Sequence, residues 1–131
     1  MAKLNYITVL GSGVLGGQIA WHTAFKGKNV VVYDIANEAL ENCKNAHQFY
    51  AGIYQSDLGA SEQEVSETVS RLTFTSSLAE AVVNADLVIE AVPEVPEIKT
   101  SVYLQMADLL PAHTLLATNS STLLPSDFAE V

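Results

Sequence analysis

Short runs of apolar and β-branched residues recur along the chain and predict strands. They cover residues 6–10, 30–33, 72–75, 87–92 and 115–118. Most of these runs lack alternating polar positions, which is typical of strands that are covered on both faces in a parallel sheet. Gly11 follows the first run and Pro93 the fourth, and both residues are stop signals for a strand.

Between these runs, the apolar residues fall at helical spacing. Helices are predicted over residues 14–25, from a cap at Asn37 through Ala46, around residues 65–72, from a cap at Ser77 through Val83, and from Pro96 to Pro111. Asn and Ser are preferred caps, and Pro fits a first helical turn because its missing N–H needs no partner there. Residues 50–64 combine two glycines with polar steps and predict no element.

Strands and helices alternate in this order, so the predicted fold class is α/β. Right-handed crossovers then produce a doubly wound parallel sheet of about five strands with helices on both faces, which is a three-layer arrangement. Of the 131 residues, 49% are apolar, which is enough to form a core. No repeat or change of composition marks an internal boundary, so residues 1–131 are expected to form one domain.

Charge narrows the range of partners. The chain has 6 basic and 15 acidic residues, a formal net charge of −9, and no cluster of basic side chains for nucleic acid or an anionic membrane.

No apolar run reaches the roughly 18 residues that span a bilayer, and no signal peptide is visible, so a cytoplasmic location is expected. The single cysteine, Cys43, is expected to be a buried apolar side chain.

A glycine-rich turn joins the first predicted strand to the first predicted helix. Its sequence, Gly-Ser-Gly-Val-Leu-Gly, fits the GxGxxG pattern that holds a dinucleotide pyrophosphate in Rossmann-type folds. Gly11 permits the tight turn, Gly13 leaves room for the phosphates, and Gly16 allows close packing of helix on strand. The expected cofactor-binding residues here are Gly11, Ser12, Gly13, Val14, Leu15 and Gly16. The alternative, a structural turn without ligand, is disfavoured by the strand–helix–strand context.

An acidic residue, Asp34, ends the second predicted strand, 23 residues after Gly11. At this place a carboxylate accepts hydrogen bonds from the adenosine ribose and repels a 2′-phosphate. No Arg follows Asp34 directly. The chain is therefore predicted to bind NAD in preference to NADP, and the alternative role for Asp34 is to help cap the next helix.

Two further stretches carry a family resemblance. They are Asp-Leu-Val-Ile-Glu-Ala-Val-Pro-Glu at residues 86–94 and Ala-Thr-Asn-Ser-Ser-Thr at residues 117–122. Together with the glycine turn and Asp34, in this order and spacing, they resemble the NAD-binding domain of the L-3-hydroxyacyl-CoA dehydrogenase family over essentially the whole chain. The resemblance implies an NAD-dependent oxidoreductase of fatty acid metabolism that oxidises the 3-hydroxyl of an acyl-CoA.

The resemblance also implies further site residues. The matched cofactor contacts are Ala91, Val92, Glu94, Lys99 and Asn119, with Glu94 and Lys99 on the nicotinamide-side ribose. Asn119 and Ser121 match the catalytic-site residues that orient the nicotinamide and the substrate oxygen, without a nucleophilic role. From the residues alone, the alternative for Glu94 and Lys99 is an exposed ion pair. The alternative for Asn119 and Ser121 is a Ser/Thr-rich turn that caps the next helix.

The family's general base, a histidine paired with a glutamate, lies after the Asn-Ser-Ser motif in a segment like His-Phe-Phe-Asn-Pro. None of His22, His47 and His113 matches it, so all three are expected to be structural or solvent-facing, and their spacing predicts no metal site. A helix cap near Ser126 followed by few residues predicts a truncated domain, with a helical dimerisation and substrate domain beyond Val131. This chain alone is then expected to be inactive, and the full-length protein a homodimer.

One stretch departs from the family. Residues 45–70 correspond to a CoA-facing helical region with basic residues, yet here they contain no Lys or Arg and four acids, Asp57, Glu62, Glu64 and Glu67. Because CoA phosphates require cationic partners, a small 3-hydroxy acid is the alternative substrate, as in carnitine or gulonate dehydrogenases. A non-catalytic NAD-binding module and a short-chain hydroxyacid dehydrogenase are further alternatives, and the Asn-Ser-Ser segment argues against the last. A 3-hydroxyacyl-CoA stays the first expectation.

Overall fold

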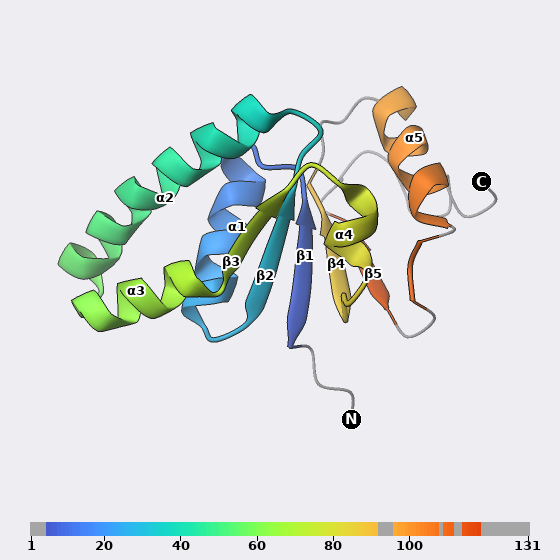
Figure 1. The fold of residues 1–131 in the computed structure, drawn as a ribbon. Helices are drawn as coiled ribbons and strands as arrows, with labels where there is room; N and C mark the ends of the chain where they lie inside the picture. The colour runs from blue at the N-terminus through green and yellow to red at the C-terminus, as the bar shows by residue number, and fades with distance from the viewer. Residues whose placement is uncertain (1–4, 92–95, 108, 112–113, 119–131) are drawn as a thin grey trace.

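Five parallel strands form the centre of the fold in the computed structural model, which describes residues 5–91, 96–107, 109–111 and 114–118. The strands are β1 (Tyr6–Leu10), β2 (Asn29–Tyr33), β3 (Leu72–Thr75), β4 (Leu87–Glu90) and β5 (Leu115–Thr118). Their order across the sheet is β3-β2-β1-β4-β5 (Figure 1), and every neighbouring pair is parallel. The prediction of a doubly wound parallel sheet is confirmed.

Helices cover both faces of this sheet, as the three-layer prediction requires. They are α1 (Val14–Phe25), α2 (Asn37–Asp57), α3 (Glu62–Ser70), α4 (Leu78–Val82) and α5 (Pro96–Ala107). The first two pack on one face, and α4 and α5 pack on the other (Figure 1). Among the described helices, none combines the length and apolar character needed to cross a membrane.

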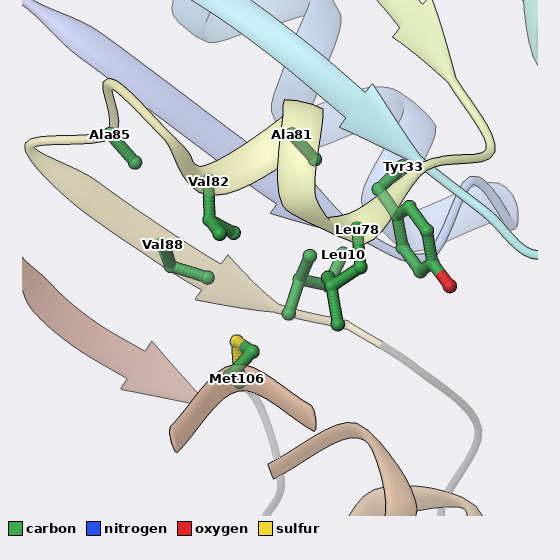
Figure 2. Packing of buried hydrophobic residues seen from close by; sticks show 8 residues of the cluster. All are labelled: Leu10, Tyr33, Leu78, Ala81, Val82, Ala85, Val88 and Met106. Carbon is green, nitrogen blue, oxygen red and sulfur yellow. The ribbon is translucent and has the colours of Figure 1, made fainter. Parts of the chain in front are cut away.

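Alternation along the central strands separates two hydrophobic cores. On β1, Ile7 and Val9 are buried in the cluster under α1 and α2, whereas Leu10 belongs to the cluster under α4 and α5. Figure 2 shows the second cluster, in which Val88 of β4 and Met106 of α5 pack around Leu10. The sheet is therefore buried on both faces, which explains why its strands lack regular polar positions.

Helix α2 is longer than the sequence predicts. It runs through Gly52 to Asp57, across part of the stretch 50–64 to which the sequence pattern assigns no element. The added turns are held by Tyr54, whose ring lies 4.9 Å from the Phe25 ring and whose hydroxyl is 2.8 Å from Nδ1 of His22. These contacts with α1 offset the roughly 1 kcal/mol that a glycine costs inside a helix.

Helix α3 begins earlier than predicted, because Ser61 forms a capping box. Its hydroxyl accepts from the Glu64 N–H, and the Glu64 carboxylate accepts from the Ser61 N–H, both at 3.0 Å. Leu72, assigned by spacing to the end of this helix as well as to a strand, lies in β3. The Ser-x-x-Glu pattern at Ser61 and Glu64 is therefore the sequence signal for the start of α3.

Other boundaries differ by one to a few residues, as three examples show. Asn37 is the first residue of α2 rather than its cap, and Ala36 occupies the cap position. Helix α5 ends at Ala107, before the predicted stop at Pro111. Strand β4 ends at Glu90, whereas the prediction extended it to residue 92. Differences of this size at element ends leave the fold unchanged.

Candidate functional site

The strand order reverses at β1, and this reversal locates the site. β1 lies between β2 and β4, so the chain leaves β1 on one side and returns to its other side. In open α/β sheets, ligands bind in the crevice at the carboxyl ends of such strands. The glycine turn lies at that edge, fastened by the bond from the Gly11 N–H to the Tyr33 carbonyl at 2.8 Å. The Ala91 N–H donates to the Leu10 carbonyl, also at 2.8 Å, from the β4 side.

The glycines of the turn fulfil distinct geometric requirements. Gly11 has a φ of +102°, which favours glycine. A Cβ on Gly16 would lie 2.0 Å from the Gly11 carbonyl oxygen, so α1 approaches the turn after β1 closer than a side chain allows. A Cβ on Gly13 would meet nothing within 4 Å, and Gly13 caps α1 without a side-chain hydrogen bond. The space beside Gly13 is therefore open at the start of α1, where the first N–H groups of a helix are suited to bind a diphosphate.

Asp34 lies beside the turn and is part of a hydrogen-bond network. Its Oδ2 accepts from the Ser12 N–H at 3.0 Å and from the Ser12 hydroxyl at 2.9 Å. Its Oδ1 accepts from the Ala36 N–H at 3.1 Å, at the start of α2. The carboxylate therefore joins the glycine turn to the end of β2, and the capping role considered as an alternative is present as well. The Ser12 side-chain bond was not predicted.

Exposed apolar side chains surround this polar centre. Val14 and Leu15, in the first turn of α1, are 75% and 53% exposed, and Ile35, directly after Asp34, is 82% exposed. Such surfaces suit the flat rings of a dinucleotide. Sequence reasoning missed Ile35, although a β-branched residue placed just past the end of a strand was an available signal.

Two buried titratable groups lie behind the turn. The His47 Nε2 is 2.8 Å from the Gly17 carbonyl oxygen in α1 and 3.5 Å from the Cys43 sulfur. Burial lowers the pKa of His47, against a smaller opposing effect of the bond to Gly17. Burial, and then the charge of Asp34, raises the pKa of Cys43 to about 11. These groups hold α2 against α1, so the structural roles expected for both are confirmed.

Several predicted site residues lie outside the described residues: Val92, Glu94, Asn119 and Ser121, and His113 as well. Lys99 belongs to α5, but its side chain is not described. The roles assigned to these residues stay predictions. Within the described ranges, no group of three or more His, Cys, Asp or Glu residues could hold a metal ion.

A strand-order reversal, a glycine turn opening onto a helix N-terminus and a neighbouring carboxylate define a dinucleotide-binding domain of the Rossmann class. Comparison with known proteins specifies which one. The family model described as "3-hydroxyacyl-CoA dehydrogenase, NAD binding domain" matches residues 6–131. The chain belongs to this family, and the cofactor of the family is NAD.

Individual relatives agree with this assignment. A probable 3-hydroxyacyl-CoA dehydrogenase of Caenorhabditis elegans is 30% identical over 99% of this chain and 45% of its own length. The structure of a diketoreductase is 44% identical with a TM-score of 0.93, covering 99% of this chain and 46% of that one. The structure of a 3-hydroxybutyryl-CoA dehydrogenase from Escherichia coli K12 is 31% identical with a TM-score of 0.91, and the match covers 99% of this chain and 28% of that one. The chain thus spans less than half the length of these relatives.

Proposed function

We propose that the protein carrying this domain is an oxidoreductase that transfers a hydride between NAD and C3 of a 3-hydroxyacyl-CoA. The observation that carries the proposal is the family match across residues 6–131, joined to a dinucleotide site whose glycines and carboxylate meet the geometric requirements. The names of the C. elegans and E. coli relatives support an acyl-CoA substrate.

Bound NAD supplies the hydride acceptor, and the described residues serve to hold and orient it. The first amides of α1, beside Gly13, bind the diphosphate. Asp34 accepts from the adenosine ribose and repels a 2′-phosphate. Asn119 and Ser121 are proposed to orient the nicotinamide and the reacting oxygen, and Glu94 and Lys99 to contact the second ribose.

The test is a steady-state assay of the intact protein with NAD and 3-hydroxybutyryl-CoA, which follows NADH formation. NAD-dependent oxidation is expected, together with a kcat/KM for NADP at least about 100-fold lower, because Asp34 opposes the 2′-phosphate. Absence of NAD-dependent oxidation with every 3-hydroxy thioester and 3-hydroxy acid would contradict an enzymatic role and favour a binding module.

A second candidate substrate is a small 3-hydroxy or dicarbonyl compound without CoA. Of the two solved structures named above, the diketoreductase has the higher identity to this chain, 44% against 31%. The basic residues that flank the cation-free stretch 45–70 are also engaged: Lys44 pairs with Glu41 at 3.4 Å, and Arg71 donates to the Ala24 carbonyl at 2.9 Å. The surface of α2 and α3 thus offers few cations to CoA phosphates.

Comparing kcat/KM for 3-hydroxybutyryl-CoA and free 3-hydroxybutyrate distinguishes the two candidates. A ratio well above one supports the CoA substrate, and a ratio below one supports the small substrate. Ionic strength provides a second criterion, because CoA phosphates held by cations would make KM rise with salt. A salt-independent KM for the thioester would contradict phosphate recognition by charge.

Two further proposals concern assembly and location; the first follows from the family resemblance and the second from the sequence pattern. We propose that the intact protein is a homodimer and that it acts in the cytoplasm. Light scattering coupled to size-exclusion chromatography tests the first, and a monomeric mass would contradict it. Cell fractionation with an antibody against the protein tests the second.

A further inference from the structure

The Asp34 carboxylate is oriented from two directions. On one oxygen, Oδ2, it receives the Ser12 N–H and the Ser12 hydroxyl. On the other, Oδ1, it receives the Ala36 N–H. Two of these donors are backbone groups beside helix starts, and the third is the hydroxyl of Ser12, a residue that is only 5% exposed. Bonds to a charged acceptor are stronger than neutral ones, so this arrangement restricts rotation of the carboxylate.

The bonds leave the two oxygens unequal. An ionised carboxylate has about four acceptor positions, about two on each oxygen. Ser12 uses two on Oδ2, and Ala36 uses one on Oδ1. Among these contacts, the open acceptor position lies on Oδ1.

We propose that Ser12 is a positioning residue for the cofactor: by occupying Oδ2 of Asp34, its hydroxyl makes Oδ1 the oxygen that accepts from the adenosine ribose. The inference rests on NAD binding at this site. Ser12 is buried and its hydroxyl is bonded to Asp34, so the hydroxyl acts on the ribose through the carboxylate. Without the hydroxyl, Oδ2 keeps one donor and the carboxylate gains freedom to turn away from the ribose.

This role differs from that of the carboxylate charge. Removing the Ser12 hydroxyl leaves the Asp34 carboxylate in place, so repulsion of a 2′-phosphate persists. Ser12→Ala is therefore expected to weaken NAD binding without improving NADP binding. Asp34→Ala is expected to weaken NAD binding and to relieve the repulsion of NADP.

The experiment measures the Kd values of the intact protein for NAD and for two analogues that lack the 2′- or the 3′-hydroxyl of the adenosine ribose. Ser12→Ala should weaken NAD binding about fivefold, the effect of part of one charge-assisted hydrogen bond. One of the two analogues lacks the hydroxyl that donates to Oδ1. For that analogue, Ser12→Ala should weaken binding by less than about twofold, because the hydrogen bond that Ser12 positions is already missing. Ser56→Ala, which removes an exposed hydroxyl near the end of α2, is the matched control and should change none of the three affinities.

Unchanged NAD affinity in Ser12→Ala would overturn the proposal, and so would an equal loss for all three ligands, since a general loosening of the turn weakens them alike. If Ser12→Ala does not fold, Ser12→Cys keeps a similar size with a weak donor and should reproduce the same pattern. These binding measurements require no turnover, so failure of the proposed dehydrogenase activity would remain distinguishable from failure of this inference.

Discussion

Two aspartates at opposite ends of the sheet make similar hydrogen bonds. Asp86, at the amino end of β4, accepts from the N–H groups of Asn5 and Tyr6 on Oδ2, at 3.1 and 3.0 Å. Asp34, at the carboxyl end of β2, accepts both the N–H and the hydroxyl of Ser12 on Oδ2. Each carboxylate therefore ties one segment of chain to a neighbouring strand.

The difference between them is position. Asp34 lies where the strand order reverses and where α1 begins, whereas Asp86 lies at the end of the sheet that α/β folds do not use for ligands. Asp86 nevertheless belongs to the segment 86–94 that carries the family resemblance. We therefore expect Asp86 to serve the fold and Asp34 to serve the ligand, a distinction that rests on topology because the bonding of the two carboxylates is similar.

The largest effect is expected for Gly16→Ala at the carboxyl end. The new Cβ would meet the Gly11 carbonyl at 2.0 Å, and backbone cannot yield cheaply, so unfolding free energy should fall by about 3 kcal/mol. Urea unfolding measures this loss. Gly52→Ala is the matched control, because a Cβ there meets nothing within 4 Å and should stabilise α2 by about 0.5–1 kcal/mol. Equal stabilities for the two variants would contradict the close approach of α1 to the turn.

Asp34→Ala should have the next largest effect, on binding. Loss of the charge-assisted hydrogen bond to the ribose should weaken NAD about 30-fold, or about 2 kcal/mol, and loss of the carboxylate should reduce the preference for NAD over NADP. Isothermal titration calorimetry with both cofactors measures these changes. An unaltered NAD/NADP ratio would show that Asp34 resembles Asp86 and has only a structural role.

Asp86→Ala should show the opposite pattern at the amino end. Its loss leaves the amides of Asn5 and Tyr6 without this acceptor, so thermal or urea unfolding should reveal a destabilisation of about 1–2 kcal/mol. The Kd for NAD, measured well below the melting temperature, should stay within about twofold of the parent value. A selective loss of NAD binding would remove the distinction between the two ends.

The smallest effect concerns pH and the His47 side chain behind the glycine turn. Burial lowers its pKa below the ordinary 6.5, so the unfolded chain takes up the proton at a higher pH than the folded chain. The stability that neutral His47 contributes is complete above about 6.5 and is lost as pH falls below that value. Melting temperatures across this range should decline more in the parent than in His47→Gln. Parallel curves would contradict the burial effect.

Local patterns were sufficient to predict most of the fold. Five strands and the helices between them follow from apolar spacing, because a sheet buried on both faces demands nearly continuous apolar strands. The extension of α2 through Gly52 could not be predicted in this way. It depends on Tyr54 meeting Phe25 and His22, which are about 30 residues away in the chain.

The site was predictable to the same extent. The strand–helix–strand unit imposes a fixed spacing on its ligand-binding residues, and this spacing identified the roles of Gly11, Gly13, Gly16 and Asp34. The bond from the Ser12 hydroxyl to Asp34 depends instead on the register in which Leu10 pairs with Tyr33 across β1 and β2. Sequence spacing does not specify that register to the accuracy of a hydrogen bond.

The pairing of β1 with β4 has a consequence for how the protein acquires its cofactor site. Ile7 of β1 pairs with Val30 of β2 on one side and with Leu87 of β4 on the other. Val30 is close to Ile7 in the chain, whereas Leu87 is 80 residues away. Closing so long a loop is slow, because its entropic cost is not offset until β4 pairs with β1. During synthesis, the crevice between β1 and β4 therefore forms only after residue 90 has emerged, and NAD can assist only the last stage of folding.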